Sequence, residues 1–263
     1  MTITRNGANK RMTKTDELLI RQHCDEVRRR IAQACARAGR APEEVRLLPV
    51  TKTVAAERLR AAFVAGLTEF GENKIQEADA KAEHLADLPV TWSIIGHLQT
   101  NKAKQAVRFA REFQALDSLR LAEALERRLQ GAGRGLDVLV QVNTSAEASK
   151  FGLAPEAVAD FLRALPAFSA LRVRGLMTLA VFDPDTVRVR ACFRRLRVLR
   201  DRLRDAAPPA IALDELSMGM SGDFEAAVEE GATVVRVGQA IFGARPLPDS
   251  HYWPGEGSGV ADQ

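Results

Sequence analysis

The sequence predicts an α/β fold, a single (β/α)8 TIM barrel with an extra N-terminal helix. Short apolar segments alternate along the chain with longer segments of helical periodicity, a pattern typical of parallel strands joined by helices. Eight apolar segments can be counted, and eight such units close a barrel. The composition does not shift sharply along the 263 residues, which indicates one domain. An open doubly wound sheet is less favoured, because no GxGxxG motif opens a helix after a strand.

The predicted elements follow one another in a regular order. The first is an amphipathic helix at about residues 15–38. The eight predicted strands are bounded by Gly, Pro, Asp or Asn and comprise residues 46–52, 69–73, 91–96, 113–118, 136–143, 173–180, 213–220 and 233–243. The clearest helices between them are residues 55–65, 118–129, 155–165 and 187–203. Residues 69–73 and 113–118 are weak strand predictions by themselves. They are supported because a barrel needs eight strand-helix units and these two complete that number.

The two ends of the chain are expected to lie outside this barrel of residues 15–246. Residues 1–14 are polar and predict a flexible leader, whereas the Pro/Gly-rich residues 247–263 predict a peripheral or disordered tail. The leader lacks the apolar stretch of a secretory signal, and no segment has the length of apolar sequence that spans a bilayer. We therefore expect a cytoplasmic protein that does not bind membranes.

The composition argues against a metal protein and against a nucleic-acid-binding protein. Cys24, Cys35 and Cys192 form no CxxC pair, and the histidines show no metal-binding spacing, so we expect reduced thiols and no metal site. Aromatic residues make up only 5% of the chain, and the arginines recur at helical spacing. This pattern favours solvated helix faces over a nucleic-acid interface.

A single lysine, Lys52, stands at the carboxyl end of a predicted strand, where barrels carry their active sites. Partial burial of its stem would lower the pKa of the amine, and a neutral amine can form a Schiff base with an aldehyde. A lysine that merely extends its amine to solvent explains the position equally well.

The segments at the carboxyl ends of the last two predicted strands distinguish these alternatives. SMGMSGD (217–223) and RVGQAIFG (236–243) combine glycines with polar residues, and turns of this type expose N–H groups that suit a phosphate dianion. These are also the loops in which barrels commonly bind phosphate, although the glycines could serve tight turns alone. A lysine opposite a phosphate site favours a cofactor with an aldehyde and a phosphate, and pyridoxal 5'-phosphate (PLP) has both.

These segments resemble the pyridoxal phosphate homeostasis protein family. The matching motifs are LLPVTKT (47–53), FGENKIQEA (70–78), WSIIGHLQTNKAK (92–104), VNTSAEASKFG (142–152), RGLMTL (174–179) and LSMGMSGDFEAAVEEGATVVRVGQAIFGAR (216–245). Together they are specific and span most of the chain from about residue 46 to residue 245. The resemblance implies the barrel of the alanine racemase N-terminal domain without the second domain of that enzyme.

The resemblance also implies a role for individual residues. PLP is expected as a Schiff base on Lys52, with its phosphate on Ser217 and the backbone of Gly238 and Gln239. Arg236 is expected to face the pyridine nitrogen; a pair with a buried carboxylate such as Glu72 or Asp214 is the alternative. The residues expected to line the ring are Asn73, Met177 and Met218, and Lys150 matches a second lysine of the family that contacts the cofactor transiently.

One segment departs from the family pattern. The family commonly has His-Phe before the Ile-Gly of the third strand, whereas this chain has Ser93 and Ile94. A histidine contact with the cofactor is therefore not expected at that place, and His97 lies on the following turn.

Two functions fit these expectations. The resemblance implies a PLP carrier or buffer in intracellular PLP homeostasis, with apoenzymes that use PLP as recipients and with no catalytic residue of its own. The alternative is a PLP-dependent amino-acid racemase, which needs an acid/base on each face of its substrate. Its relatives use a tyrosine, and the single tyrosine here, Tyr252, lies in the predicted tail. We therefore favour a carrier, and we expect it to be a monomer. An adaptor that binds RNA or protein through its basic helices has no motif to support it.

Overall fold

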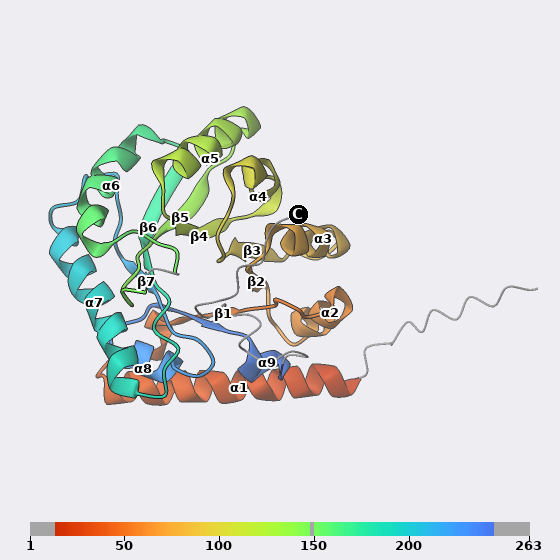
Figure 1. Cartoon of the computed structure of the whole chain (residues 1–263). Helices are drawn as coiled ribbons and strands as arrows, with labels where there is room; N and C mark the ends of the chain where they lie inside the picture. Colours follow the sequence, from red (N-terminus) through yellow and green to blue (C-terminus); the bar gives the residue numbers. More distant parts are fainter. Residues whose placement is uncertain (1–13, 148–149, 245–263) are drawn as a thin grey trace, which may run out of the picture.

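The computed structural model describes residues 14–147 and 150–244, in which eight parallel strands alternate with helices around one barrel (Figure 1). The elements are α1 (Lys14–Arg37), β1 (Arg46–Pro49), α2 (Ala56–Val64), β2 (Glu69–Glu72), α3 (Ile75–His84), β3 (Thr91–Ile94), α4 (Ala103–Phe109), β4 (Glu112–Leu116), α5 (Leu119–Ala132), β5 (Leu136–Gln141), α6 (Val158–Ala164), β6 (Leu171–Met177), α7 (Thr186–Arg204), β7 (Glu215–Ser217), α8 (Phe224–Glu229), β8 (Val234–Val237) and α9 (Gln239–Phe242).

The strands follow the spatial order β1-β8-β7-β6-β5-β4-β3-β2. The first and last members of this order meet just beyond their ends, where Val50 pairs with Gly71 and the Thr51 amide donates to the Gly71 carbonyl at 2.9 Å. This contact joins the two edges, so the predicted (β/α)8 barrel is confirmed.

All eight predicted strands are present, and each is shorter than predicted. The first, for example, ends at Pro49, three residues before Lys52. The two weakest predictions are confirmed as β2 and β4, whose Phe70 and Phe113 are completely buried. A strand buried on both faces reads as a short apolar run without alternation, which is why such segments are weak signals alone.

Helix α1 confirms the predicted extra N-terminal helix and lies across the outside of the barrel against α2, α8 and α9 (Figure 1). Its buried side chains recur at helical spacing and are Ile20, Cys24, Val27, Ile31, Ala34 and Cys35. All three cysteines are free and buried. Lys14, placed in the predicted leader, is the first residue of α1; residues 1–13 and the predicted tail 247–263 lie outside the described residues.

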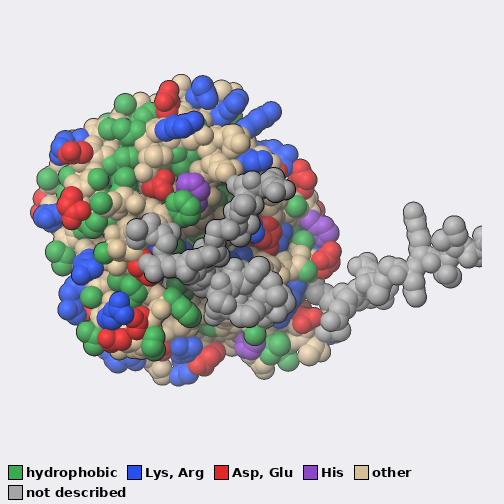
Figure 2. Space-filling model, in the orientation of Figure 1, with side chains coloured by type: hydrophobic (Ala, Val, Ile, Leu, Met, Phe, Trp, Pro, Cys, Tyr) green, Lys and Arg blue, Asp and Glu red, His purple; other side chains and the backbone are tan. Residues whose placement is uncertain are grey.

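The arginines of α7 remain partly exposed, as predicted, but they also form ion pairs with the end of α8. Arg190 pairs with Glu229 and Glu230, and Arg194 and Arg197 contact Glu230 at 3.0 and 3.3 Å. Glu230 is buried although the arginines are partly exposed, so these arginines supply the opposite charge that a buried carboxylate requires. Figure 2 shows basic and acidic side chains interspersed on the face that it presents.

Within the described residues, no helix is long and apolar enough to cross a membrane, and no cluster of three or more His, Cys, Asp or Glu could hold a metal ion.

Candidate cofactor-binding site

A cavity of about 270 Å³ lies beyond the ends of β1 and β8. Lys52 and Arg58 line it from the loop after β1 and from α2, and Gly238 and Gln239 line it from the turn after β8. Its volume is close to about 300 Å³, the lower limit for ordinary small-molecule pockets. The structure thus brings the predicted lysine and two of the predicted phosphate-binding residues to one place.

The turn after β8 directs backbone amides at a single oxygen. Ser221 Oγ accepts hydrogen bonds from the amides of Gly238 at 3.2 Å and Ala240 at 3.3 Å. Gly238 must be glycine, because a Cβ there would lie 2.9 Å from the carbonyl oxygen of Val50, which is backbone and cannot easily move away. Amides that converge on one oxygen in this way can also receive an oxygen of an anion.

The loop between β7 and α8 holds Ser221 beside this turn. Gly219 has a φ of +95°, and a Cβ there would come within 2.5 Å of Ala227 Cβ, so only glycine fits. The Met220 amide donates to Asp223 Oδ1 at 2.6 Å. Burial raises the pKa of Asp223, and this hydrogen bond partly opposes the increase. The SMGMSGD motif therefore gives one defined loop with Ser221 facing the amides.

Ser217 lies elsewhere, inside the barrel. It is completely buried at the end of β7, where its hydroxyl donates to Gln114 Oε1 at 2.6 Å and accepts from Arg236 Nη1 at 2.7 Å. The hydroxyl that contacts the Gly238 turn is that of Ser221, which the sequence analysis did not single out. Its signal was present in the motif, because Ser221 follows the turn-forming Gly219 whereas Ser217 precedes it.

Arg236 is buried and donates to two acceptors, one on the adjacent strand β7 and one just after β6. Besides Ser217, its guanidinium donates to the Thr178 carbonyl at 2.8 Å. Glu72, one of the two alternative partners, is instead hydrogen bonded to Lys81. Burial lowers the pKa of Arg236 to about 10, and the charges of Asp223 and Glu112 oppose that decrease. The guanidinium therefore stays charged at neutral pH.

A chain of hydrogen bonds continues from Arg236 through the barrel. From Ser217 it passes to Gln114, whose Nε2 donates to Glu112 Oε2 at 2.7 Å. The other oxygen of Glu112 accepts from Arg46 Nη2 at 2.6 Å at the opposite end of the barrel. Every group in this chain has a partner, so the orientation of Arg236 is fixed from within the barrel.

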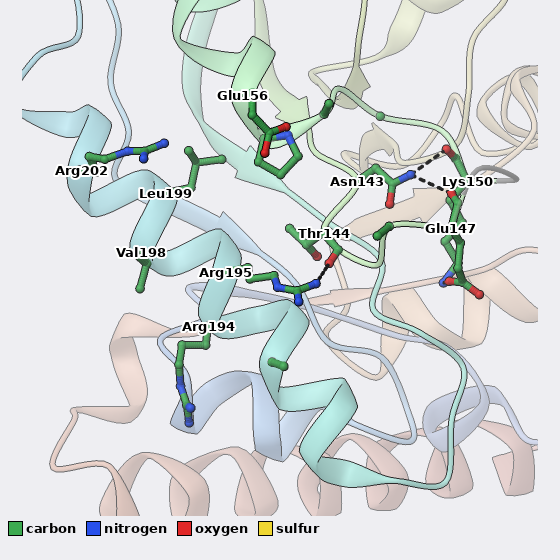
Figure 3. A pocket seen from close by; sticks show the side chains of 15 residues that line it. Asn143, Thr144, Glu147, Lys150, Glu156, Arg194, Arg195, Val198, Leu199 and Arg202 are labelled. Atoms are coloured by element: carbon green, nitrogen blue, oxygen red, sulfur yellow. Dashed lines mark hydrogen bonds and ion pairs between the residues drawn. The ribbon is translucent and has the colours of Figure 1, made fainter.

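Lys150 lines a different and larger cavity, of about 1060 Å³, between the loop after β5 and helix α7 (Figure 3). Its amine donates to the Ala180 carbonyl at 2.8 Å and forms an ion pair with Glu147. Arg195 reaches across the same cavity from α7 to the Thr144 carbonyl, at 3.0 Å. Lys150 therefore does not share the lining of the cavity beside Lys52.

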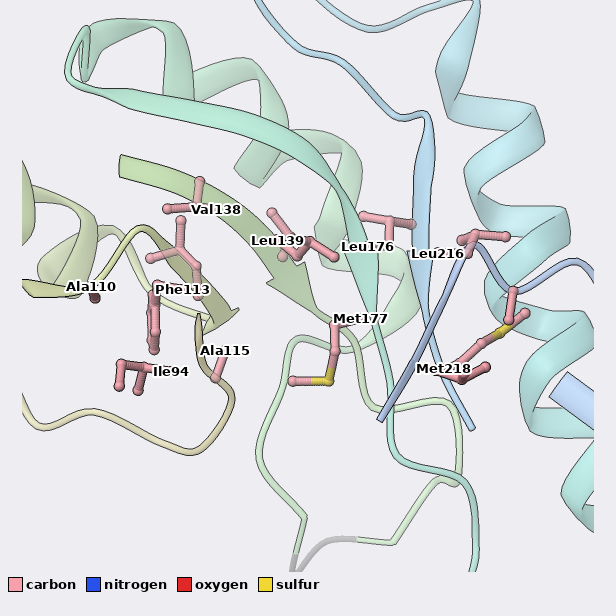
Figure 4. Close-up of a cluster of buried hydrophobic side chains, with 14 of the residues drawn as sticks. Ile94, Ala110, Phe113, Ala115, Val138, Leu139, Leu176, Met177, Leu216 and Met218 are labelled. Atoms are coloured by element: carbon pink, nitrogen blue, oxygen red, sulfur yellow. The ribbon is translucent and has the colours of Figure 1, made fainter. Parts of the chain in front are cut away.

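The residues predicted to line the ring lie at three strand ends. Met177 and Met218 are both completely buried in the hydrophobic core (Figure 4). Met177 pairs in register with Ser217, so its side chain faces the barrel interior, whereas alternation directs Met218 to the other side of the sheet. Asn73 directly follows β2 and is half-buried. The contacts of these three residues with a cofactor stay predictions.

The departure from the family pattern in β3 has a structural counterpart. Ser93 is buried and its hydroxyl donates to Glu112 Oε2 at 2.7 Å, so it joins the polar chain inside the barrel. His97 is exposed and stacks on Phe151 with 4.1 Å between the ring centres. Its Nδ1 lies 3.8 Å from Asp117 Oδ2.

Comparisons with known proteins agree with this fold. The family model described as alanine racemase, N-terminal domain, matches residues 22–246. The pyridoxal phosphate homeostasis protein of Pseudomonas aeruginosa is 42% identical over 226 residues, which is 86% of this chain and 96% of that protein. That of Aquifex aeolicus is 40% identical over 224 residues, or 85% and 97% of the two chains.

Solved structures extend the similarity. PipY of Synechococcus elongatus PCC7942 with PLP bound has a TM-score of 0.72 and 38% identity, and the match covers 81% of this chain and 100% of PipY. An unknown protein from Bifidobacterium adolescentis has a TM-score of 0.83 and 36% identity, over 90% and 100% of the two chains. An alanine racemase of Clostridium difficile 630 shares only the fold, with a TM-score of 0.68 and 13% identity over 88% of this chain and 57% of the enzyme. By sequence and by fold, this chain belongs to the pyridoxal phosphate homeostasis protein family, with the barrel of the alanine racemase N-terminal domain.

Proposed function

We propose that this protein binds PLP and acts in PLP homeostasis as a carrier or buffer, with the cofactor held on Lys52. The observation that carries the proposal is the cavity that Lys52 lines together with Gly238 and Gln239. Lys52, whose amine can bond to an aldehyde, and Gly238, whose amide belongs to the turn that would bind a phosphate, line the same small space. The family membership and the PLP-bound PipY structure support the same cofactor.

The residues present fit the groups of PLP. The amides of Gly238 and Ala240 already converge on the oxygen of Ser221, and they would bind the phosphate together with that hydroxyl. Arg236, charged and fixed from within the barrel, would donate to the pyridine nitrogen. When bound, PLP would supply an aldehyde for a covalent bond to the Lys52 amine.

A carrier explains the chain better than a racemase does. The similarity to alanine racemase covers 57% of that enzyme, so the remainder of the racemase has no counterpart in this match. The single tyrosine, Tyr252, lies outside the described residues. A barrel alone would leave one face of the cofactor accessible to solvent, which suits transfer of the cofactor and does not exclude water as catalysis usually requires.

Transfer of the cofactor tests this proposal. The PLP-loaded protein is incubated with a PLP-dependent apoenzyme, and recovery of that enzyme's activity is followed beside a reaction with the same concentration of free PLP. We expect recovery of the apoenzyme and no rapid turnover when the loaded protein receives a panel of amino acids. Turnover of any amino acid at ordinary enzyme rates, about 1 s⁻¹ or more, would contradict the carrier function.

Arg236 gives a second prediction, for the protonation of the cofactor ring. A guanidinium only donates hydrogen bonds, so it favours an unprotonated pyridine nitrogen. We therefore expect nitrogen-15 NMR of labelled PLP on the protein to show an unprotonated ring. Arg236→Ala should weaken PLP binding and still permit the bond to Lys52. A protonated ring nitrogen in the wild-type protein would show that Arg236 does not have this role.

A further inference from the structure

Lys81, on helix α3, is a buried lysine outside the residues assigned above. Only 7% of its side chain is exposed. Its amine donates to the Thr51 carbonyl at 2.7 Å, to Glu72 Oε1 at 2.6 Å and to Glu77 Oε1 at 2.6 Å. An ammonium group has three protons, so these acceptors fully satisfy it. We call Lys81, Glu72 and Glu77 the Lys81 cluster.

This cluster holds the residues on both sides of Lys52. Before it, the Thr51 hydroxyl donates to Glu72 Oε1 at 2.6 Å, and the Thr51 carbonyl accepts from Lys81. After it, the Thr53 amide donates to Glu77 Oε1 at 2.8 Å. The backbone that carries Lys52 is thus fixed at two consecutive peptide groups by side chains from β2 and α3.

The conformation that the cluster holds is a costly one. Thr53 has a φ of 67°, in the left-handed region that a β-branched residue rarely adopts. Such a conformation costs about 1–2 kcal/mol and persists where the surroundings determine it. The hydrogen bond from the Thr53 amide to Glu77 is made in this conformation, so it opposes a return of the turn to an ordinary backbone.

Stability alone explains the cluster poorly. A buried ion pair contributes little net stability, because removing the charges from water costs about as much as their attraction returns. Burial raises the pKa of Glu72, and among the described residues its Oε2 atom is buried without a hydrogen-bond partner. Apolar side chains would pack α3 against the barrel at least as well. What the cluster does that apolar residues could not is hold the polar backbone at Thr51 and Thr53.

We propose that the Lys81 cluster positions Lys52 for reaction with an aldehyde, and that Lys81 is a positioning residue for it. The inference rests on the proposed function, since it requires Lys52 to be the residue that binds PLP covalently. In that reaction the Lys52 nitrogen forms a double bond to the aldehyde carbon, and the aldehyde oxygen leaves as water with the two amine protons. A displacement of the turn would slow this step without affecting the phosphate turn after β8.

Two ligands separate positioning from a general structural role. PLP has the aldehyde, whereas pyridoxine 5'-phosphate has an alcohol in its place and binds only through the ring and the phosphate. We expect Lys81→Met to lower the affinity for PLP, and the rate at which its visible absorption band appears, by about tenfold. Affinity for pyridoxine 5'-phosphate should stay within about twofold of the wild type, because misplacement of the turn leaves non-covalent binding intact.

The matched control is Lys104→Met, which removes an exposed lysine from the neighbouring helix α4 and should change neither affinity. Equal losses for the two ligands in Lys81→Met would show a structural role only, and an unchanged PLP affinity would also overturn the proposal. Circular dichroism and thermal melting of the full-length variants establish that they fold.

Glu77 provides a second pair of variants, decisive if Lys81→Met does not fold. Its side chain is 29% exposed, so changing it disturbs the core less. Glu77→Ala removes the acceptor for the Thr53 amide and should show the selective loss for PLP, whereas Glu77→Gln retains an acceptor oxygen and should restore most of it. If Glu77→Ala does not lower the affinity for PLP more than that for pyridoxine 5'-phosphate, the proposal is contradicted.

Peptide mapping of the borohydride-reduced wild type tests the proposed function separately. A label on a residue other than Lys52 refutes that function, whereas a label on Lys52 leaves the variants to decide the role of the cluster.

Discussion

Lys52→Ala is expected to abolish the visible absorption band that the purified protein acquires with PLP. Alanine has no amine to bond to the aldehyde, and Lys52 is the lysine that lines the cavity with the Gly238–Gln239 turn. The absorption band should disappear completely, although PLP should still bind weakly through its phosphate. The measurement is the absorption spectrum of wild type and variant at equal PLP concentration, before and after borohydride reduction.

Two other lysines serve as controls for this result. Lys150 is already engaged with Ala180 and Glu147, and Lys74 is exposed at the start of α3. Lys150→Ala and Lys74→Ala should keep the band. If peptides of the reduced wild-type protein carry the phosphopyridoxyl group mainly on Lys150 or Lys74, the assignment to Lys52 is wrong.

The second large effect concerns the phosphate of PLP. Two amide hydrogen bonds to a charged phosphate contribute about 1.5 kcal/mol each, which corresponds to about a hundredfold in affinity. Pyridoxal, which lacks the phosphate, should therefore bind at least about a hundredfold more weakly than PLP. Titration followed by absorbance gives both affinities, and comparable values would contradict a phosphate site at the Gly238 turn.

Glycine variants test whether this turn is responsible. A Cβ on Gly238 would lie 2.9 Å from the Val50 carbonyl, so Gly238→Ala must shift the turn and should reduce the advantage of PLP over pyridoxal. Gly222 lies in the neighbouring loop and has open space for a Cβ, so Gly222→Ala is the matched control and should leave the advantage unchanged.

Serine variants decide between the two hydroxyls of the SMGMSGD motif. Ser221→Ala removes the hydroxyl beside the Gly238 amide and should lower the affinity for PLP more than that for pyridoxal. Ser217→Ala removes an acceptor of Arg236. It should lower the affinities for PLP and for pyridoxal by the same factor, because both molecules contain the pyridine ring. If Ser217→Ala instead lowers the affinity for PLP more than that for pyridoxal, and Ser221→Ala does not, Ser217 binds the phosphate as the sequence predicted.

Local pattern was sufficient to predict the architecture. The strands and helices follow from the spacing of apolar residues, which depends on the periodicity of the backbone and not on distant contacts. The position of Lys52 just beyond the first strand, and of Gly238 just beyond the last, could be read in the same way, because parallel strands of a barrel end on one side.

The direction and surroundings of polar side chains depended on the tertiary structure. Ser217 and Ser221 look alike in the sequence, but β7 ends at Ser217, so Ser217 faces the barrel interior and Ser221 faces the amide of Gly238.

Lys81 shows the same limit of sequence reasoning. Four residues after Glu77, it has the spacing of an exposed helix pair, and only the packing of α3 against β2 buries it and brings its amine to the Thr51 carbonyl. The sequence by itself thus determined the barrel and the place of Lys52 at a strand end, since short-range periodicity encodes both. Only the tertiary structure decided which serine meets the amides and which residues hold Lys52, because those contacts join segments that the chain order does not relate.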